Sequence, residues 1–169
     1  MASGKHCTGL GTLEFSVILV VIGFIWLVAL DRLHALQELG EKTAVEMTVS
    51  NMRSGVRWEM ADRIMTGREA SLVELAGSNP VRWLEKSPEG YLGEFAAPPE
   101  RFPPGSWYFD VSSKELHYRP ILVRNLQCQQ CERIAGEVAL SWRIARSGNP
   151  MFGRGDTVRI VAITPYRWF

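Results

Sequence analysis

LGTLEFSVILVVIGFIWLVAL, residues 10–30, is the stretch that decides the architecture of this chain. Its only charged side chain is Glu14, and Phe15–Leu30 contains none. A helix rises about 1.5 Å per residue, so a run of this length spans the hydrocarbon core of a membrane, which is about 30 Å thick. Lys5 precedes the run, and a basic leader stays on the cytoplasmic side. The sequence therefore predicts an N-terminal transmembrane helix with the rest of the chain exported.

An ordinary cleaved signal peptide and a plain signal anchor are two other interpretations of this run. The run is longer than a signal-peptide core of about 7–15 residues, and residues 27–30 (LVAL) lack the paired small residues of an A-x-A cleavage site. A plain anchor leaves Glu14 unexplained, because an acidic side chain inside a membrane segment costs about 2.5–3.5 kcal/mol and usually has a function. Glu14 is therefore the informative residue.

The setting of Glu14 is GLGTLEF, residues 9–15, which resembles the N-terminal signal of type IV prepilins and type II secretion pseudopilins. The resemblance implies that a prepilin peptidase cuts between Gly9 and Leu10, and that Leu10 becomes the N-methylated terminus. Met1–Gly9 fits the short hydrophilic leader of that family. The resemblance also implies that Glu14 neutralises the terminal amine of a neighbouring subunit during assembly. Because pairing two charges often only offsets their desolvation, we expect this contact to set register more than to add stability.

A filament-forming structural subunit, not an enzyme and without a cofactor, is the function that this resemblance implies. Its expected partners are the prepilin peptidase, other pilin-like subunits, an inner-membrane assembly platform and membrane lipid. Its expected location is the bacterial inner membrane, with one transmembrane helix, a periplasmic C-terminal domain and incorporation into a periplasmic or surface filament. Leu10 replaces the phenylalanine common in the family, and residues 29–32 (ALDR) lack the proline that many major pilins carry there. The missing proline favours a pseudopilin or a minor pilin.

The charge balance gives no reason to expect nucleic acid as a partner. The chain has 19 Lys and Arg against 18 Asp and Glu, and cleavage after Gly9 would remove only Lys5, which leaves 18 of each. A neutral chain lacks the excess of positive charge that binds a phosphate backbone. The length of 169 residues favours one domain, with two possible.

The N-terminal helix is expected to continue beyond the membrane, because no proline occurs between Met1 and Asn79. Apolar residues recur at spacings of three and four and mark one face: Val45, Val49, Met52, Val56, Met60 and Ile64. Gly67 is the expected stop. The chain is thus divided into a prepilin leader (1–9), a transmembrane and assembly helix (10–30), the exported half of that helix (31–66) and a periplasmic globular α+β domain (67–169).

Strand patterns fill most of the C-terminal part. A short helix is expected at Glu69–Ala76, and a helical turn at 79–84 is expected to be capped by Asn79. The expected strands are Tyr91–Phe95, Ser106–Asp110, Glu115–Val123, Gly136–Ala145 and Asp156–Thr164. Alternation alone predicts an α+β fold. The resemblance implies the pilin-like form of it, a long N-terminal helix packed on a 3–4-stranded antiparallel sheet.

Individual side chains of these strands can be assigned to the core or the surface. Leu116, Tyr118 and Ile121 are candidate core residues, whereas His117 alternates with them and is expected to be exposed. The aromatic end, Trp168-Phe169, is expected to pack in the core, with an exposed interaction patch as the alternative.

Cys128 and Cys131 form a C-x-x-C pair between two expected strands. Three states remain open: a structural disulfide, reduced or mixed thiols, and a redox-active or metal-binding pair. A redox pair normally begins a helix, which lowers the thiol pKa, and no clear helix follows here. Zinc needs about four ligands, and His117 is the only other obvious candidate nearby. We predict no metal site, since Asn149 and Asp156 are also too few oxygen ligands for calcium in the late loop.

Two further functions stay open. One is a membrane-anchored periplasmic thiol oxidoreductase that uses Cys128 and Cys131, and the other is a signal-anchored binding domain that is never processed. The sequence contains no glycine-rich nucleotide loop, no H-E-x-x-H motif and no recognisable serine–histidine–aspartate set. Cleavage and methylation of the N-terminus distinguish the filament subunit from the unprocessed anchor. Thiol exchange activity distinguishes the enzyme from the filament subunit.

Overall fold

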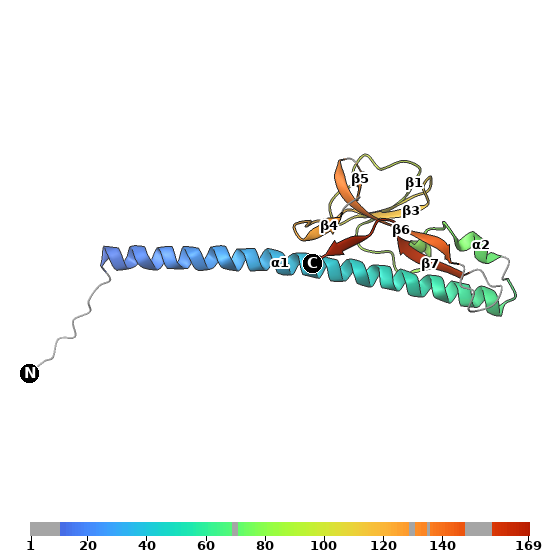
Figure 1. Cartoon of the computed structure of the whole chain (residues 1–169), viewed down its shortest axis with the longest axis horizontal. Helices are drawn as coiled ribbons and strands as arrows, with labels where there is room; N and C mark the ends of the chain where they lie inside the picture. Colours follow the sequence, from blue (N-terminus) through green and yellow to red (C-terminus); the bar gives the residue numbers. More distant parts are fainter. Residues whose placement is uncertain (1–10, 69–70, 129–130, 135, 148–156) are drawn as a thin grey trace, which may run out of the picture. The chain divides into compact units, whose positions relative to one another are not determined.

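The computed structural model describes residues 11–68, 71–128, 131–134, 136–147 and 157–169. It contains one long helix, α1 (Thr12–Met65), followed by a mixed sheet, so the fold is α+β (Figure 1). The chain divides into two compact units, Met1–Leu39 and Gly40–Phe169. Helix α1 has 54 residues and ends at Met65, one residue before the predicted end of its exported half.

The first unit contains the exposed, apolar part of α1. Every side chain from Gly11 to His34 is exposed. Two of its polar side chains contact the backbone of the same helix. Ser16 Oγ donates to the carbonyl oxygen of Thr12 at 2.8 Å, and His34 Nδ1 lies 2.8 Å from the carbonyl oxygen of Leu30. The segment Phe15–Leu30 carries no charged side chain, so its surface is almost entirely hydrocarbon.

The second unit contains the rest of α1, and here one face of the helix is buried. Val45, Val49, Met52 and Val56 are each at most 4% exposed and belong to the main hydrophobic core. The predicted apolar face is therefore confirmed over these turns, whereas Ile64 at its far end is 46% exposed. The helix ends at the predicted glycine: Gly67 has φ +71°, its N–H donates to the Ile64 carbonyl at 3.1 Å, and Arg68 N–H donates to the Arg63 carbonyl at 2.7 Å. This pair of bonds is the Schellman arrangement that stops a helix.

The main sheet lies against this buried face. Its strand order is β1-β2-β3-β6-β5, with β7 also pairing with β6, and a separate pair joins β4 to β8. The strands are β1 (Tyr91–Phe95), β2 (Trp107–Asp110), β3 (Glu115–Tyr118), β4 (Leu126–Cys128), β5 (Glu132–Ile134), β6 (Glu137–Ser147), β7 (Thr157–Ala162) and β8 (Tyr166–Trp168). Helix α2 (Leu72–Leu75) and the 3-10 helix η2 (Pro80–Trp83) precede them, and Asn79 caps η2 by accepting from Val81 N at 3.0 Å.

The expected 3–4-stranded antiparallel sheet is wrong in two respects. The main sheet has six strands, and β1 runs parallel to β2, with Tyr91 opposite Trp107. The chain between Phe95 and Trp107 contains Pro98, Pro99, Pro103 and Pro104, and it returns to the start of the sheet instead of forming a hairpin. Strands β4, β5 and β8 have three residues each, which is too short for alternation to be recognised in the sequence.

Two expected elements are shorter in the structure, and one core assignment fails with them. Strand β3 ends at Tyr118 rather than Val123, because Pro120 has no N–H to continue a ladder. Ile121 consequently lies outside the strand and is 60% exposed, which corrects its assignment to the core. The helix expected at Glu69–Ala76 is described only as α2, since residues 69 and 70 lie outside the described residues.

The prediction that His117 is exposed is also wrong. It is 1% exposed, its Nδ1 lies 2.7 Å from Ser141 Oγ, and its ring stacks on Tyr108 at 4.9 Å between centroids. A second cluster, formed by Phe102, Tyr108, Ile134 and Ala139, covers this side of the sheet. Strand β3 is therefore buried on both faces, and alternation cannot indicate which of its side chains are exposed. At the C-terminus, Trp168 is 3% exposed as expected, but Phe169 is 43% exposed.

Candidate functional site

Glu14 lies in the first turn of α1, where its carboxylate contacts the start of its own helix. Oε2 of Glu14 accepts a hydrogen bond from Gly11 N at 3.2 Å. Since α1 begins at Thr12, Gly11 is the N-cap residue and Glu14 the third residue of the helix, which is the reciprocal half of a capping box. Its negative charge is also favourable beside the positive end of the helix dipole. Gly9 and Leu10, where the expected cleavage falls, lie outside the described residues.

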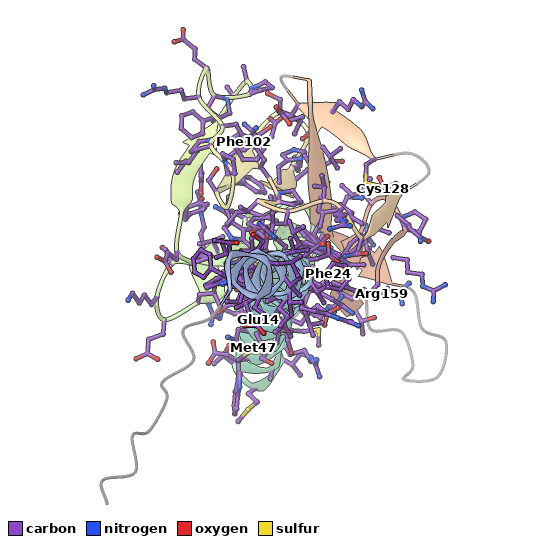
Figure 2. All side chains as sticks on the ribbon, turned by 90° about the vertical axis from the view of Figure 1, so that its left-hand side faces the viewer. Glu14, Phe24, Met47, Phe102, Cys128 and Arg159 are labelled. Carbon is purple, nitrogen blue, oxygen red and sulfur yellow. A yellow bond between two sulfur atoms is a disulfide. The ribbon has the colours of Figure 1, made fainter. Side chains whose placement is uncertain are left out.

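The helix after Glu14 exposes large apolar side chains on all sides. Phe24, Trp26 and Leu27 are 67%, 63% and 69% exposed, and Figure 2 shows Phe24 and Glu14 on this segment. Burying one such side chain is worth about 1.5–3 kcal/mol, so the run as a whole represents tens of kcal/mol of unfavourable hydration. A helix that is apolar around its whole circumference requires lipid or other protein around it.

One helix among the described residues, α1, is long and apolar enough to cross a membrane by length and composition. The apolar window within it lies near the N-terminus and is exposed throughout. A single N-terminal membrane anchor is compatible with this finding.

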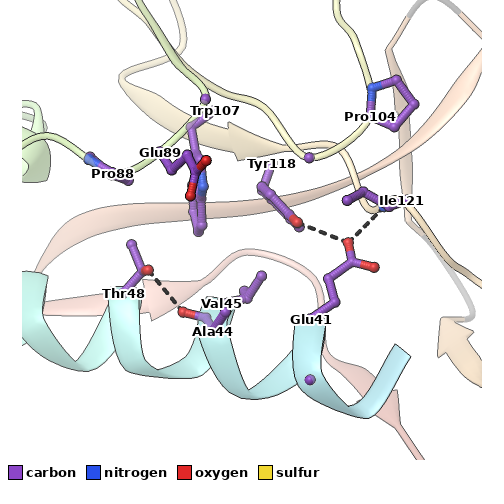
Figure 3. A pocket seen from close by; sticks show the side chains of 13 residues that line it. Glu41, Ala44, Val45, Thr48, Pro88, Glu89, Pro104, Trp107, Tyr118 and Ile121 are labelled. Carbon is purple, nitrogen blue, oxygen red and sulfur yellow. Dashed lines mark hydrogen bonds between the residues drawn. The ribbon is translucent and has the colours of Figure 1, made fainter. Parts of the chain in front are cut away.

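A carboxylate that sequence reasoning missed joins α1 to the end of β3 in the second unit. Oε1 of Glu41 accepts hydrogen bonds from Tyr118 Oη at 2.8 Å and from Ile121 N at 2.6 Å (Figure 3). Oε2 of Glu41 accepts from Leu122 N at 3.1 Å. The two N–H groups follow Pro120, where the strand ladder has ended. Burial, together with the hydrogen bond to Glu41, raises the pKa of Tyr118, so its hydroxyl remains a donor at ordinary pH. No sequence pattern predicts this contact, because Tyr118 and Leu122 lie 77 and 81 positions after Glu41.

An open cavity of about 690 Å³ lies beside this contact. Its lining includes Glu41, Glu89, Trp107 and Tyr118, which Figure 3 shows between α1 and the sheet. Within the described part of the chain, no three His, Cys, Asp or Glu side chains come close enough together to hold a metal ion. The arrangement holds helix and sheet together and contains no recognisable catalytic set.

Cys128 and Cys131 are joined by a disulfide, with their Cα atoms 5.5 Å apart. The bond links the end of β4 to the residue before β5, and residues 129 and 130 between them lie outside the described residues. Disulfide sulfurs are not thiolate ligands, and His117 is buried against Ser141 and Tyr108, so these residues do not form a zinc site together. Asn149 and Asp156 lie outside the described residues.

Comparison with known proteins gives no family assignment. No protein-family model, no curated protein and no solved structure matches this chain.

Proposed function

We propose that this chain is a pilin-like subunit, a pseudopilin or minor pilin, that assembles through its N-terminal helix into a type II secretion or type IV pilus filament. A prepilin peptidase cleaves it between Gly9 and Leu10, and Leu10 is then N-methylated. The mature subunit is held in the inner membrane by one helix, with its C-terminal domain in the periplasm, until an assembly platform adds it to other pilin-like subunits. The protein itself catalyses no reaction.

The observation that carries the proposal is the position of Glu14. It is the only acidic residue at the start of an exposed apolar run, and it follows Gly9 at the spacing of a prepilin signal. The element order supports the proposal more generally, because a long N-terminal helix precedes a sheet.

The contact of Glu14 with Gly11 indicates how its role changes with processing. In the full chain the carboxylate accepts from Gly11 N, which is a neutral donor. Cleavage would create a charged amine at Leu10 on each subunit, and a charged donor makes a hydrogen bond roughly twice as strong. Assembly would thus exchange a contact within one chain for a charged contact between two. The pairing fixes the axial position of one helix against the next while offsetting the desolvation of both groups.

The test is the chemistry of the mature N-terminus. The full chain is produced together with a prepilin peptidase, extracted from the membrane and analysed by intact mass and N-terminal fragmentation. We expect a chain that begins at Leu10 and carries one added methyl group. Gly9→Val is the matched control, because it should block cleavage and leave membrane insertion unchanged. A native chain that keeps Met1, or that is cut near Asp31, contradicts the proposal.

A thiol oxidoreductase is the second candidate, and one observation favours it. The disulfide borders a cavity of about 800 Å³ whose lining includes Cys128, Pro165 and Tyr166. However, Cys128 ends a strand and does not begin a helix, so the helix dipole that lowers a redox thiol's pKa is missing. Replacing both cysteines by serine separates the candidates. Loss of thiol exchange with filament incorporation intact would favour the enzyme.

A further inference from the structure

Three arginines from two elements line one small cavity in the second unit. Arg53 and Arg57 of α1 and Arg159 of β7 border a cavity of about 340 Å³. All three are exposed, and Figure 2 labels Arg159. The feature does not involve the apolar run, Glu14 or the disulfide, so it is independent of the function proposed above.

None of these three arginines has an acidic partner in the part of the chain that the structure describes. The acidic side chains on the neighbouring turns of α1 pair elsewhere: Glu46 with Lys42 at 3.9 Å, Glu59 with Arg63 at 2.7 Å and Asp62 with Arg68 at 2.6 Å. Arg53 and Arg57 are also four residues apart on one helix, a spacing at which like charges repel each other. Positive charge therefore gathers at this cavity without an acidic partner among the described residues.

The floor of the cavity is apolar. Val56, Val158 and Ile160 are at most 5% exposed, and Met60 packs against the same core cluster. Strand β7 pairs with β6 in the described sheet, so this cavity lies along its other side, towards α1. Guanidinium groups at the rim of an apolar floor attract an anion more strongly than they would in open solvent, because the surrounding hydrocarbon lowers the local dielectric constant.

We propose that this cavity binds a phosphate group. A phosphate offers several acceptor oxygens in tetrahedral directions, so more than one guanidinium can donate to it, whereas a carboxylate is satisfied by one bidentate arginine. The volume suits a small group, being near the lower end of ligand-site volumes. The phosphate comes from the headgroup of an anionic lipid, whose apolar part covers the floor, or from a free phosphate that leaves the floor uncovered.

The experiment measures binding to the full chain in a neutral detergent. Inorganic phosphate and monomeric dihexanoyl phosphatidylglycerol are titrated separately at constant ionic strength, and the arginine Nε–H signals are followed by NMR. We expect saturable shifts of the Arg53, Arg57 and Arg159 signals with at least one probe. Replacing Arg53 or Arg57 by glutamine should weaken binding at least about tenfold each, because each variant loses a hydrogen bond between charged groups. Arg133→Gln on β5 is the matched control, because Arg133 is exposed and does not line the cavity.

The two probes identify the source of the phosphate. Tighter binding of the lipid than of inorganic phosphate supports a headgroup site, and binding of inorganic phosphate at least as tight supports a free-phosphate site. No saturable shift with either probe, or equal weakening by Arg133→Gln, overturns the proposal. The melting temperature without ligand gives a further criterion. Relief of repulsion should leave Arg57→Gln as stable as the native chain or more so, and a clear loss of stability with unchanged binding would assign Arg57 a structural role instead.

Discussion

The two parts of α1 are built from similar apolar residues, yet they present them differently. From Phe15 to Leu30 the side chains are uncharged and exposed around the helix, whereas from Val45 to Val56 the apolar side chains form one buried stripe opposite a charged face. The stripe is buried within the chain, because it packs on the sheet. The apolar surface of the first part is not buried by the chain itself and requires lipid or other subunits around it. One continuous helix therefore combines a segment that stabilises its own fold with a segment whose environment comes from outside.

The strongest test of this comparison is to truncate a side chain in each part. Met52 is 0% exposed, so Met52→Ala should leave a cavity and reduce the free energy of unfolding of the second unit by about 2–5 kcal/mol. Val20 is 72% exposed, so Val20→Ala should leave that free energy unchanged. Urea denaturation in detergent, followed by tryptophan fluorescence, measures both. An equal loss for the two variants would show that the first part also packs on the fold.

The contact between Glu41 and Tyr118 gives the next largest effect. Tyr118→Phe removes a hydrogen bond to a charged acceptor, which is worth about 1.5–3 kcal/mol. Tyr166→Phe is the matched control, because the hydroxyl of Tyr166 has no hydrogen-bond partner among the described residues. We expect chemical denaturation at neutral pH to show a clear loss of stability for Tyr118→Phe and a smaller one for Tyr166→Phe.

The same contact predicts how stability changes at alkaline pH. The pKa of Tyr118 is raised in the folded chain by burial and by Glu41, while an unfolded tyrosine has a pKa of about 10. Above that pH the unfolded chain releases a proton that the folded chain retains, so stability falls as the pH rises. Tyr118→Phe should flatten this fall between about pH 9.5 and 11. The decline does not disappear completely, because burial also raises the pKa of Tyr91 and Tyr166.

Glycines along α1 provide a third comparison. A Cβ on Gly55 would overlap the carbonyl oxygen of Trp83, so Gly55→Ala should cost about 1–3 kcal/mol. A Cβ on Gly40 meets nothing within 4 Å, so Gly40→Ala should instead stabilise the helix by up to about 1 kcal/mol. Opposite signs in thermal unfolding are the expected result. Two stabilising substitutions would mean that η2 does not pack closely on the helix at Gly55.

Local signals in the sequence predicted the elements whose cause is local. The continuous course of α1, its stop at Gly67 and the Asn79 cap of η2 follow from periodicity, left-handed glycine geometry and side-chain capping. Contacts between distant segments could not be read in this way. The burial of His117 depends on Phe102 and Tyr108 covering the second face of the sheet, and the role of Glu41 depends on Pro120 ending a strand far along the chain.

The candidate site shows the same division between local and distant causes. Glu14 could be singled out because its spacing from Gly9 and its place in an apolar run are features of continuous sequence. The arginine-lined cavity could not, since Arg159 joins Arg53 and Arg57 only when β7 lies beside α1. Periodicity also does not reveal that a charged residue has no partner, because this depends on where every other charge is placed.

The smallest expected change in stability comes from Glu14→Gln, which separates the two roles of this side chain. Glutamine can still accept from Gly11 N, as the third residue of a capping box, so only the charge–dipole term of about 0.3–1 kcal/mol is lost. Unfolding of the second unit should not change. Incorporation into filaments with native subunits should nevertheless fall sharply, because an amide cannot neutralise the amine at Leu10. Cleaved Glu14→Gln that is incorporated as well as the native chain would show that Glu14 serves the helix start alone, and the first part of α1 would then need only lipid around it.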